Sequence, residues 1–85
     1  MRIETSKFHV PDRATFIQFL NWLKQDFTNN PDDWENRNLA DFLEALAPYT
    51  EAIQGFYDNT GQNVNADEAS WQLFADILSG ATMYD

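Results

Sequence analysis

Four acidic residues in the middle of the chain are spaced so that a single helical face could carry them. They are Asp41, Glu44, Glu51 and Asp58. On a helical wheel they fall within about 100° of one another, opposite the leucines of the same segment. Asp41 and Glu44, one turn apart, could act as general acid and base, but that chemistry needs a concave site where the two pKa values differ. We expect a convex, solvated helix face instead, and therefore no catalytic residue and no enzyme.

The other polar residues form no pattern typical of a catalytic, metal or cofactor site. The single histidine, His9, lies in a weakly patterned stretch, and no Gly-x-Ser-x-Gly nucleophile motif occurs. The run from Asp58 resembles a calcium loop, but Asn63 and Ala69 stand where an EF-hand requires glycine and an acid. The three glycines are too far apart for a phosphate-binding loop. Without cysteine there is no thiolate zinc site, and we expect neither metal nor cofactor.

The elements that must position the acidic residues are three amphipathic helices. Apolar residues three or four positions apart predict helices over about 12–28, 38–59 and 70–82. Side chains suited to capping stand where these helices begin, at Asp12, Asn38 and Ser70. Pro48 removes one backbone hydrogen bond inside the second helix. Because the apolar spacing keeps its phase across Pro48, we favour one kinked helix, with a break there as the alternative.

The apolar faces of these helices predict a shared, aromatic-rich core. The first face holds Phe16, Leu20, Leu23 and Phe27. The second holds Leu39, Leu43, Leu46, Thr50, Ile53 and Tyr57. The third holds Trp71, Phe74, Leu78 and Ala81. We therefore predict an all-α, single-domain bundle of three helices spanning residues 1–85, with an N-terminal arm over about 1–11.

Two aromatic residues lie away from the centre of these faces. Trp34 follows Pro31 and two aspartates in an acidic loop. It either covers the end of the core as a lid or stands exposed as an anchor for a partner, since Trp and Tyr dominate interface hot spots. Tyr49, beside Pro48, projects between the core and the acidic face. Both residues are candidates for binding a partner.

The charge of the chain is both large and uneven. The formal net charge is −9, and residues 38–85 hold eight acids with no Lys, Arg or His, whereas residues 1–37 sum to −1. Such an excess favours encounters with cationic partners and argues against direct nucleic-acid binding. The alternative is that the acids only keep the domain soluble. No apolar run is long enough to span a membrane, and the N-terminus lacks the apolar core of a signal peptide, so we expect a cytoplasmic protein.

Three runs of the sequence resemble a family of small acidic bacterial domains of unknown function. They are WENRNLADFLEA at 34–45, GFY at 55–57 and SWQLFADIL at 70–78. The resemblance covers about residues 16–84 and consists mostly of core and capping residues, so it implies a fold rather than an activity. Pro48 departs from it, because this segment resembles a continuous helix in other members. In size and charge alone, the chain is also similar to immunity proteins that block secreted toxins.

Together these features indicate an interaction protein that binds and neutralises a basic protein partner, most concretely a bacterial toxin such as a nuclease. The expected partner-binding residues are Trp34, Asp41, Glu44, Tyr49, Glu51 and Asp58. One alternative is an inhibitor that mimics nucleic acid and binds a DNA- or RNA-binding protein. Another is a small structural or assembly subunit, which predicts stable self-association or an exposed apolar face.

Overall fold

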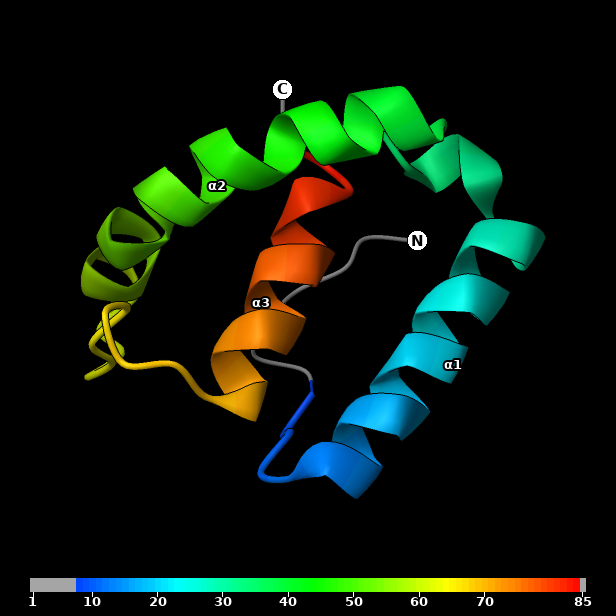
Figure 1. The fold of residues 1–85 in the computed structure, drawn as a ribbon. Helices are drawn as coiled ribbons and strands as arrows, with labels where there is room; N and C mark the ends of the chain where they lie inside the picture. The colour runs from blue at the N-terminus through cyan, green and yellow to red at the C-terminus, as the bar shows by residue number, and fades with distance from the viewer. Residues whose placement is uncertain (1–7, 85) are drawn as a thin grey trace.

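Three α-helices and one short 3-10 helix make up the fold. A computed structural model of the chain describes residues 8–84, so most of the predicted arm lies outside the described residues. The elements are α1 (Arg13–Asn29), η2 (Pro31–Asp33), α2 (Leu39–Asn59) and α3 (Trp71–Ala81) (Figure 1). No strand occurs between residues 8 and 84. The predicted all-α bundle of three helices is confirmed, and each helix begins one residue after the predicted start.

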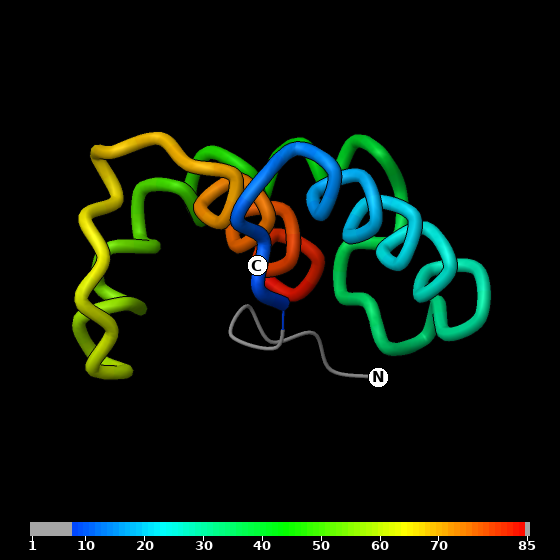
Figure 2. The backbone as a smooth tube through the Cα atoms, turned by 90° about the horizontal axis from the view of Figure 1, so that it is seen from below, coloured from blue at the N-terminus to red at the C-terminus, as the bar shows by residue number. Residues whose placement is uncertain are grey.

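The third helix lies at the centre of the molecule. Figures 1 and 2 show α3 between α1 on one side and α2 on the other. It packs against both of them, whereas α1 and α2 do not pack against each other. The chain therefore forms an open arrangement in which α2 arches across one end of α3 (Figure 1).

All three predicted caps are present at the helix starts. The Asp12 carboxylate accepts the N–H of Thr15 at 2.8 Å, and the Ser70 hydroxyl accepts the N–H of Leu73 at 3.0 Å. At the start of α2, Oδ1 of Asn38 accepts the N–H of Asp41 at 2.8 Å. Each cap satisfies a backbone donor that has no partner within its helix, which fixes the residue at which the helix begins.

The second helix continues through Pro48 without a break. Residues 39–59 form one α-helix with Pro48 inside it. Its axis curves along its length (Figures 1 and 2). A proline inside a helix removes one hydrogen bond and pushes the preceding turn aside, which bends the axis. The interpretation of Pro48 as a bend rather than a break is confirmed.

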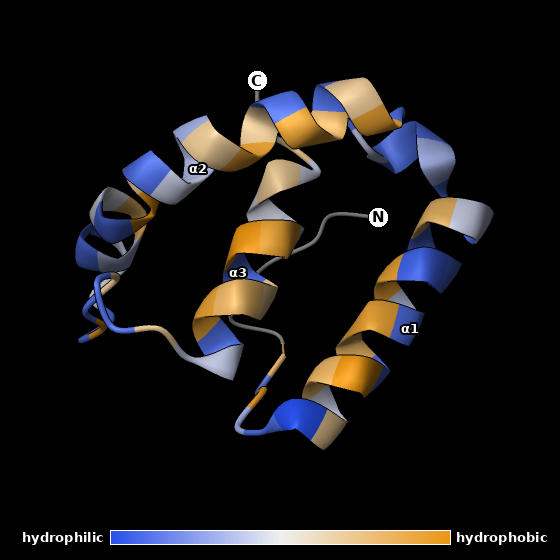
Figure 3. Cartoon of the chain, viewed as in Figure 1, coloured by the Kyte–Doolittle hydropathy of each residue, from blue (hydrophilic) through white to orange (hydrophobic). Residues whose placement is uncertain are grey.

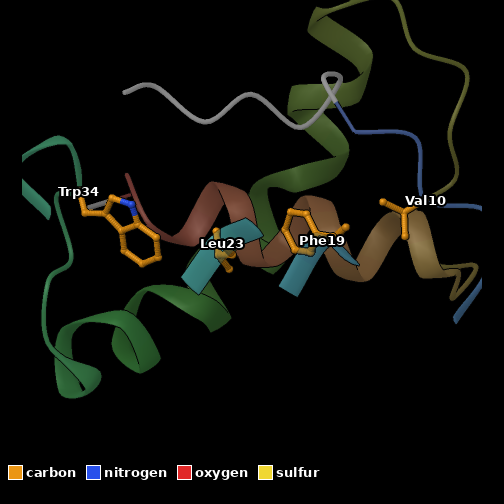
Figure 4. Close-up of a cluster of buried hydrophobic side chains, with 5 residues drawn as sticks. Val10, Phe19, Leu23 and Trp34 are labelled. Carbon is orange, nitrogen blue, oxygen red and sulfur yellow. The ribbon is translucent and has the colours of Figure 1, made fainter. Parts of the chain in front are cut away.

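The core consists of two clusters, one on each side of α3. The larger cluster holds Val10, Phe19, Leu23, Trp34 and Ala75, and Figure 4 shows its four labelled side chains in a row along α3. The smaller cluster joins α2 to α3 and holds Ile53, Tyr57 and Leu73. The first cluster therefore holds α1 against α3, and the second holds α2 against α3.

Parts of the apolar faces that were predicted to form a shared core are exposed. Leu39 is 71% exposed, Leu43 is 54% exposed and Phe74 is 41% exposed. The cause is that α1 and α2 do not pack together, so the start of α2 has no helix against it. On α3 the buried positions include Leu73 and Ala75 rather than Phe74. Figure 3 shows where apolar residues, in orange, lie along α1 and α3.

Candidate functional site

A cleft lies beside the first half of α2. Its volume is about 300 Å³, and it is lined by Asn36, Asp41, Glu44, Ala45, Pro48 and Tyr84. We call it the acidic cleft. Asp41 and Glu44 were expected on a convex, solvated face; both are exposed, but they line one wall of this cleft. The loop before α2 and the chain after α3 provide the opposite wall, which no spacing within α2 could reveal.

Hydrogen bonds from one asparagine hold the two walls of the acidic cleft together. The side-chain amide of Asn36 donates to the backbone oxygens of Ala81 at 2.7 Å and Tyr84 at 2.6 Å. The backbone N–H groups of Glu35 and Asn36 both donate to the oxygen of Thr82 at 3.0 Å. These bonds tie the loop before α2 to the end of α3, and they place Tyr84 beside the carboxylates.

Trp34 closes the end of the core and anchors the loop before α2 to the core. Its indole Nε1 donates to Oδ2 of Asp26 at 2.8 Å, and both residues are more than nine-tenths buried. Its ring packs edge-on against Phe27, with centroids 4.9 Å apart. The first alternative, a lid over the core, is therefore correct for Trp34. The second alternative, an exposed anchor for a partner, is wrong for Trp34, because only 8% of the residue is accessible.

The carboxylates of the acidic cleft differ in their partners. Oδ2 of Asp41 accepts a hydrogen bond from the amide of Asn38 at 3.0 Å. Glu44 has no hydrogen bond or ion pair within residues 8–84, and no Lys or Arg of that range lines the cleft. A carboxylate pair without a cation attracts a guanidinium or ammonium group. Tyr84 also lines the cleft, and an aromatic ring attracts a cation placed over its face.

Tyr49 lies half-buried between α2 and α3. Its ring contacts Gly80, where a side chain would overlap it, and packs edge-on against Tyr84 with centroids 5.3 Å apart. Burial, and in second place the Asp76 carboxylate, raises the pKa of its phenol. Tyr49 therefore supports the position of Tyr84, and its contact with a partner stays a prediction.

The acidic face continues beyond the cleft. Glu51 and Asp58 are exposed on the second half of α2, and Oδ1 of Asp58 accepts a hydrogen bond from Gln54 at 3.1 Å. We call Asp41, Glu44, Glu51 and Asp58 together the acidic ridge. The structure brings Asp41 and Glu44 to the cleft, whereas Glu51 and Asp58 do not line it.

Sequence reasoning missed a buried carboxylate on α3. Asp76 is 3% exposed, and it accepts hydrogen bonds from the hydroxyl of Tyr57 at 2.6 Å and the amide of Gln72 at 3.0 Å. The same amide of Gln72 donates to the oxygen of Phe8 at 2.8 Å, and Oε1 of Gln72 accepts the N–H of Val10 at 2.7 Å. The available signal was the pair Gln72 and Asp76, two polar residues four positions apart inside an apolar helix. Because the group is enclosed, it organises the core rather than a site.

Within the described residues, no group of three or more His, Cys, Asp and Glu side chains could hold a metal ion. None of the helices between residues 8 and 84 has both the length and the apolar character needed to cross a bilayer.

The fold and the cleft define a small, acidic, all-α domain with a carboxylate-lined recess on its surface. Residues 12–85 match the family described as "Family of unknown function (DUF7660)", and because the match spans most of the chain, the chain belongs to this family. The resemblance to a domain family of unknown function is thereby confirmed. No curated protein and no solved structure matches the chain.

Proposed function

We propose that the chain binds a basic protein partner through the acidic cleft and ridge and thereby neutralises it. The most concrete partner is a bacterial toxin such as a nuclease, met in the cytoplasm. The observation that supports binding is the acidic cleft itself, in which Glu44 has no partner of its own within residues 8–84. The toxin as partner rests on likeness in size and charge to immunity proteins, which is an analogy.

The mechanism is occlusion of cationic side chains. An arginine of the partner enters the acidic cleft, pairs with Asp41 and Glu44, and stacks on the ring of Tyr84. A nuclease needs Lys and Arg side chains to hold phosphate groups. Engaging one of them in the cleft removes it from that task, so the partner loses its hold on nucleic acid.

The rest of the acidic ridge acts at longer range. Glu51 and Asp58 carry their charges along the exposed face of α2 beyond Pro48. Complementary charge outside the central contact mainly speeds association, whereas burial at the centre sets the lifetime of the complex. Glu51 and Asp58 therefore steer the partner, and the cleft retains it.

A pull-down from the source cells at low salt, eluted with a salt gradient and read by mass spectrometry, tests the proposal. The bait is the wild-type chain, and the matched variant is Glu44→Lys. The control is Asp67→Lys, which makes the same charge change at an exposed position in the loop before α3. We expect wild type and Asp67→Lys to retain one basic protein above about 0.3 M salt, whereas Glu44→Lys does not. At this salt concentration, charges more than a few ångströms apart are screened.

The identity of the captured protein separates the alternatives. A toxin supports neutralisation, whereas a nucleic-acid-binding protein that is no toxin supports the mimic. A mixture of basic proteins released at low salt contradicts specific binding and leaves the ridge as a solubilising surface. An assembly subunit is the second candidate, because large apolar side chains such as Leu39 and Leu43 are exposed.

A further inference from the structure

The segment just before α1 is part of the core, yet it has no backbone pairing to hold it there. We call residues 8–11 the strap. Val10 is 1% exposed in the larger core cluster, and Figure 4 shows it beside α3. Within residues 8–84, no backbone group of the strap pairs with another backbone group. Pro11 has no N–H to donate, so the strap depends on side chains for its position.

One side chain of α3 makes the hydrogen bonds that fix the strap. Oε1 of Gln72 accepts the N–H of Val10 at 2.7 Å, and Nε2 of Gln72 donates to the backbone oxygen of Phe8 at 2.8 Å. The same Nε2 also donates to Oδ1 of Asp76 at 3.0 Å. Because a carboxylate only accepts, Asp76 determines which end of the Gln72 amide faces Phe8 and which faces Val10. Gln72 is thus a latch whose orientation is set within α3.

Two side chains of the strap make its apolar contacts. Besides Val10, the ring of Phe8 packs edge-on against Phe19 with centroids 5.4 Å apart, and its centroid lies 4.6 Å from that of Trp22. Phe19 is fully buried, so the strap is part of what covers it. The other two strap residues, His9 and Pro11, are exposed.

We propose that the strap opens as a unit while the three helices stay folded, with Gln72 as its latch, and that opening uncovers Phe19. Ordering four residues costs conformational entropy, and only one amide and two apolar side chains offset that cost. The helices have two core clusters and caps of their own, and the strap precedes residues 12–85, which match the family. Segments with few contacts open at a lower free energy than the whole fold. This opening does not depend on the function proposed above.

Thiol labelling of the full chain tests the strap, because the chain has no cysteine of its own. Val10→Cys reports opening of the strap, and Ser79→Cys, at a position 2% exposed on α3, reports opening of the helices. Helix content and urea unfolding show that each variant is folded and give its global stability. At equal global stability, we expect Val10→Cys to react at least about tenfold faster than Ser79→Cys. Its rate should change little in dilute urea, because opening the strap exposes little surface.

Substitutions at the contacts of the strap test what holds it closed. Added to Val10→Cys, Phe8→Ala removes the ring from Phe19 and should speed labelling at least about fivefold. His9→Ala is the matched control, since its exposed neighbour in the strap should change the rate by no more than about twofold. Gln72→Ala should speed labelling of Val10→Cys by a larger factor than labelling of Ser79→Cys. A merely structural role of Gln72 in α3 would change both rates by the same factor.

Hydrogen exchange of the wild-type chain measures the same opening without a substitution. The N–H of Val10 should exchange through an opening that depends weakly on urea, whereas the N–H of Ala75, inside α3, should exchange with the stronger urea dependence of global unfolding. Equal urea dependence of the two amides overturns the proposal. So does a Val10→Cys thiol that reacts no faster than Ser79→Cys at equal stability, or a Phe8→Ala variant that is labelled no faster than His9→Ala.

Discussion

The hydroxyl of Tyr57 donates a hydrogen bond of 2.6 Å to Oδ2 of Asp76, and both side chains are enclosed in the core between α2 and α3. The amide of Gln72 donates to the other oxygen of Asp76 and also to the backbone of Phe8. One buried carboxylate therefore connects α2, α3 and the segment before α1. Burial, together with the bond to Asp76, holds the pKa of Tyr57 well above its usual range, so it remains a donor.

Removing the donor should weaken the fold by more than the loss of a surface hydroxyl. Tyr57→Phe leaves Oδ2 of Asp76 without its 2.6 Å partner inside the core. We expect the free energy of unfolding to fall by about 1.5–3 kcal/mol, as for hydrogen bonds to charged groups. Urea unfolding measures it, with Tyr84→Phe as control, because that hydroxyl has no hydrogen bond within residues 8–84. Equal effects of the two variants would show that the bond to Asp76 contributes nothing.

The free energy of unfolding should depend on pH through the protonation of Asp76. Burial raises the pKa of Asp76, and the bonds from Tyr57 and Gln72 offset that rise only in part. A carboxyl with a raised folded pKa stabilises the fold fully below the unfolded value of 3.8, and this contribution is lost as the pH rises through the folded pKa.

The variant Asp76→Asn removes that titration. The unfolding free energy of wild type minus that of the variant should therefore decrease between about pH 3 and about pH 7. Urea unfolding at intervals across this range supplies the difference. A difference that rises with pH would mean that the hydrogen bonds, rather than burial, dominate the pKa of Asp76.

Two glycines in helices should respond to alanine in opposite directions. A side chain at Gly80 would overlap the ring of Tyr49, whereas nothing lies within 4 Å of one at Gly55. Gly80→Ala should destabilise the fold by about 1–3 kcal/mol through overpacking. Gly55→Ala should stabilise it by about 0.5–1 kcal/mol through helix propensity. Thermal or urea unfolding distinguishes them, and a stabilised Gly80→Ala variant would contradict the packing of Tyr49 against α3.

The lid over the core should matter through its hydrogen bond as well as its size. Trp34→Phe leaves the buried Oδ2 of Asp26 without the indole donor at 2.8 Å and leaves space beside Phe27. We expect a loss of about 2–4 kcal/mol in unfolding free energy. Trp71→Phe is the control, because Trp71 is 36% exposed at the start of α3. If Trp71→Phe proves the more damaging, the role given to Trp34 is wrong.

The sequence predicts the helices well because their signals are local. Asp12, Asn38 and Ser70 act as caps through bonds to residues only three positions away, so spacing alone is enough to find them. Pro48 could be placed inside a helix because the apolar phase continues across it. Local pattern thus accounts for the elements and for their approximate ends.

The parts that could not be predicted depend on contacts distant in sequence. The exposure of Leu39 and Leu43 follows from the absence of packing between α1 and α2, which periodicity does not encode. The acidic cleft depends on bonds from Asn36 to residues 45 and 48 positions away. From the sequence alone, Asp76 is indistinguishable from a surface acid, whereas in the structure it is buried against Tyr57. In each case the sequence supplies the residue type but not the residues that pack against it.

The most direct test of the central claim is the association rate of the chain with the basic partner recovered by pull-down, measured by stopped flow at low and high salt. Charge reversal by Glu44→Lys with Glu51→Lys should slow association at least about tenfold at low salt, and the difference should shrink as salt screens the ridge. Asp67→Lys with Glu68→Lys, an equal charge change in the loop before α3, should stay within about twofold of wild type. Equal association rates for all three proteins would contradict the acidic ridge as the binding surface.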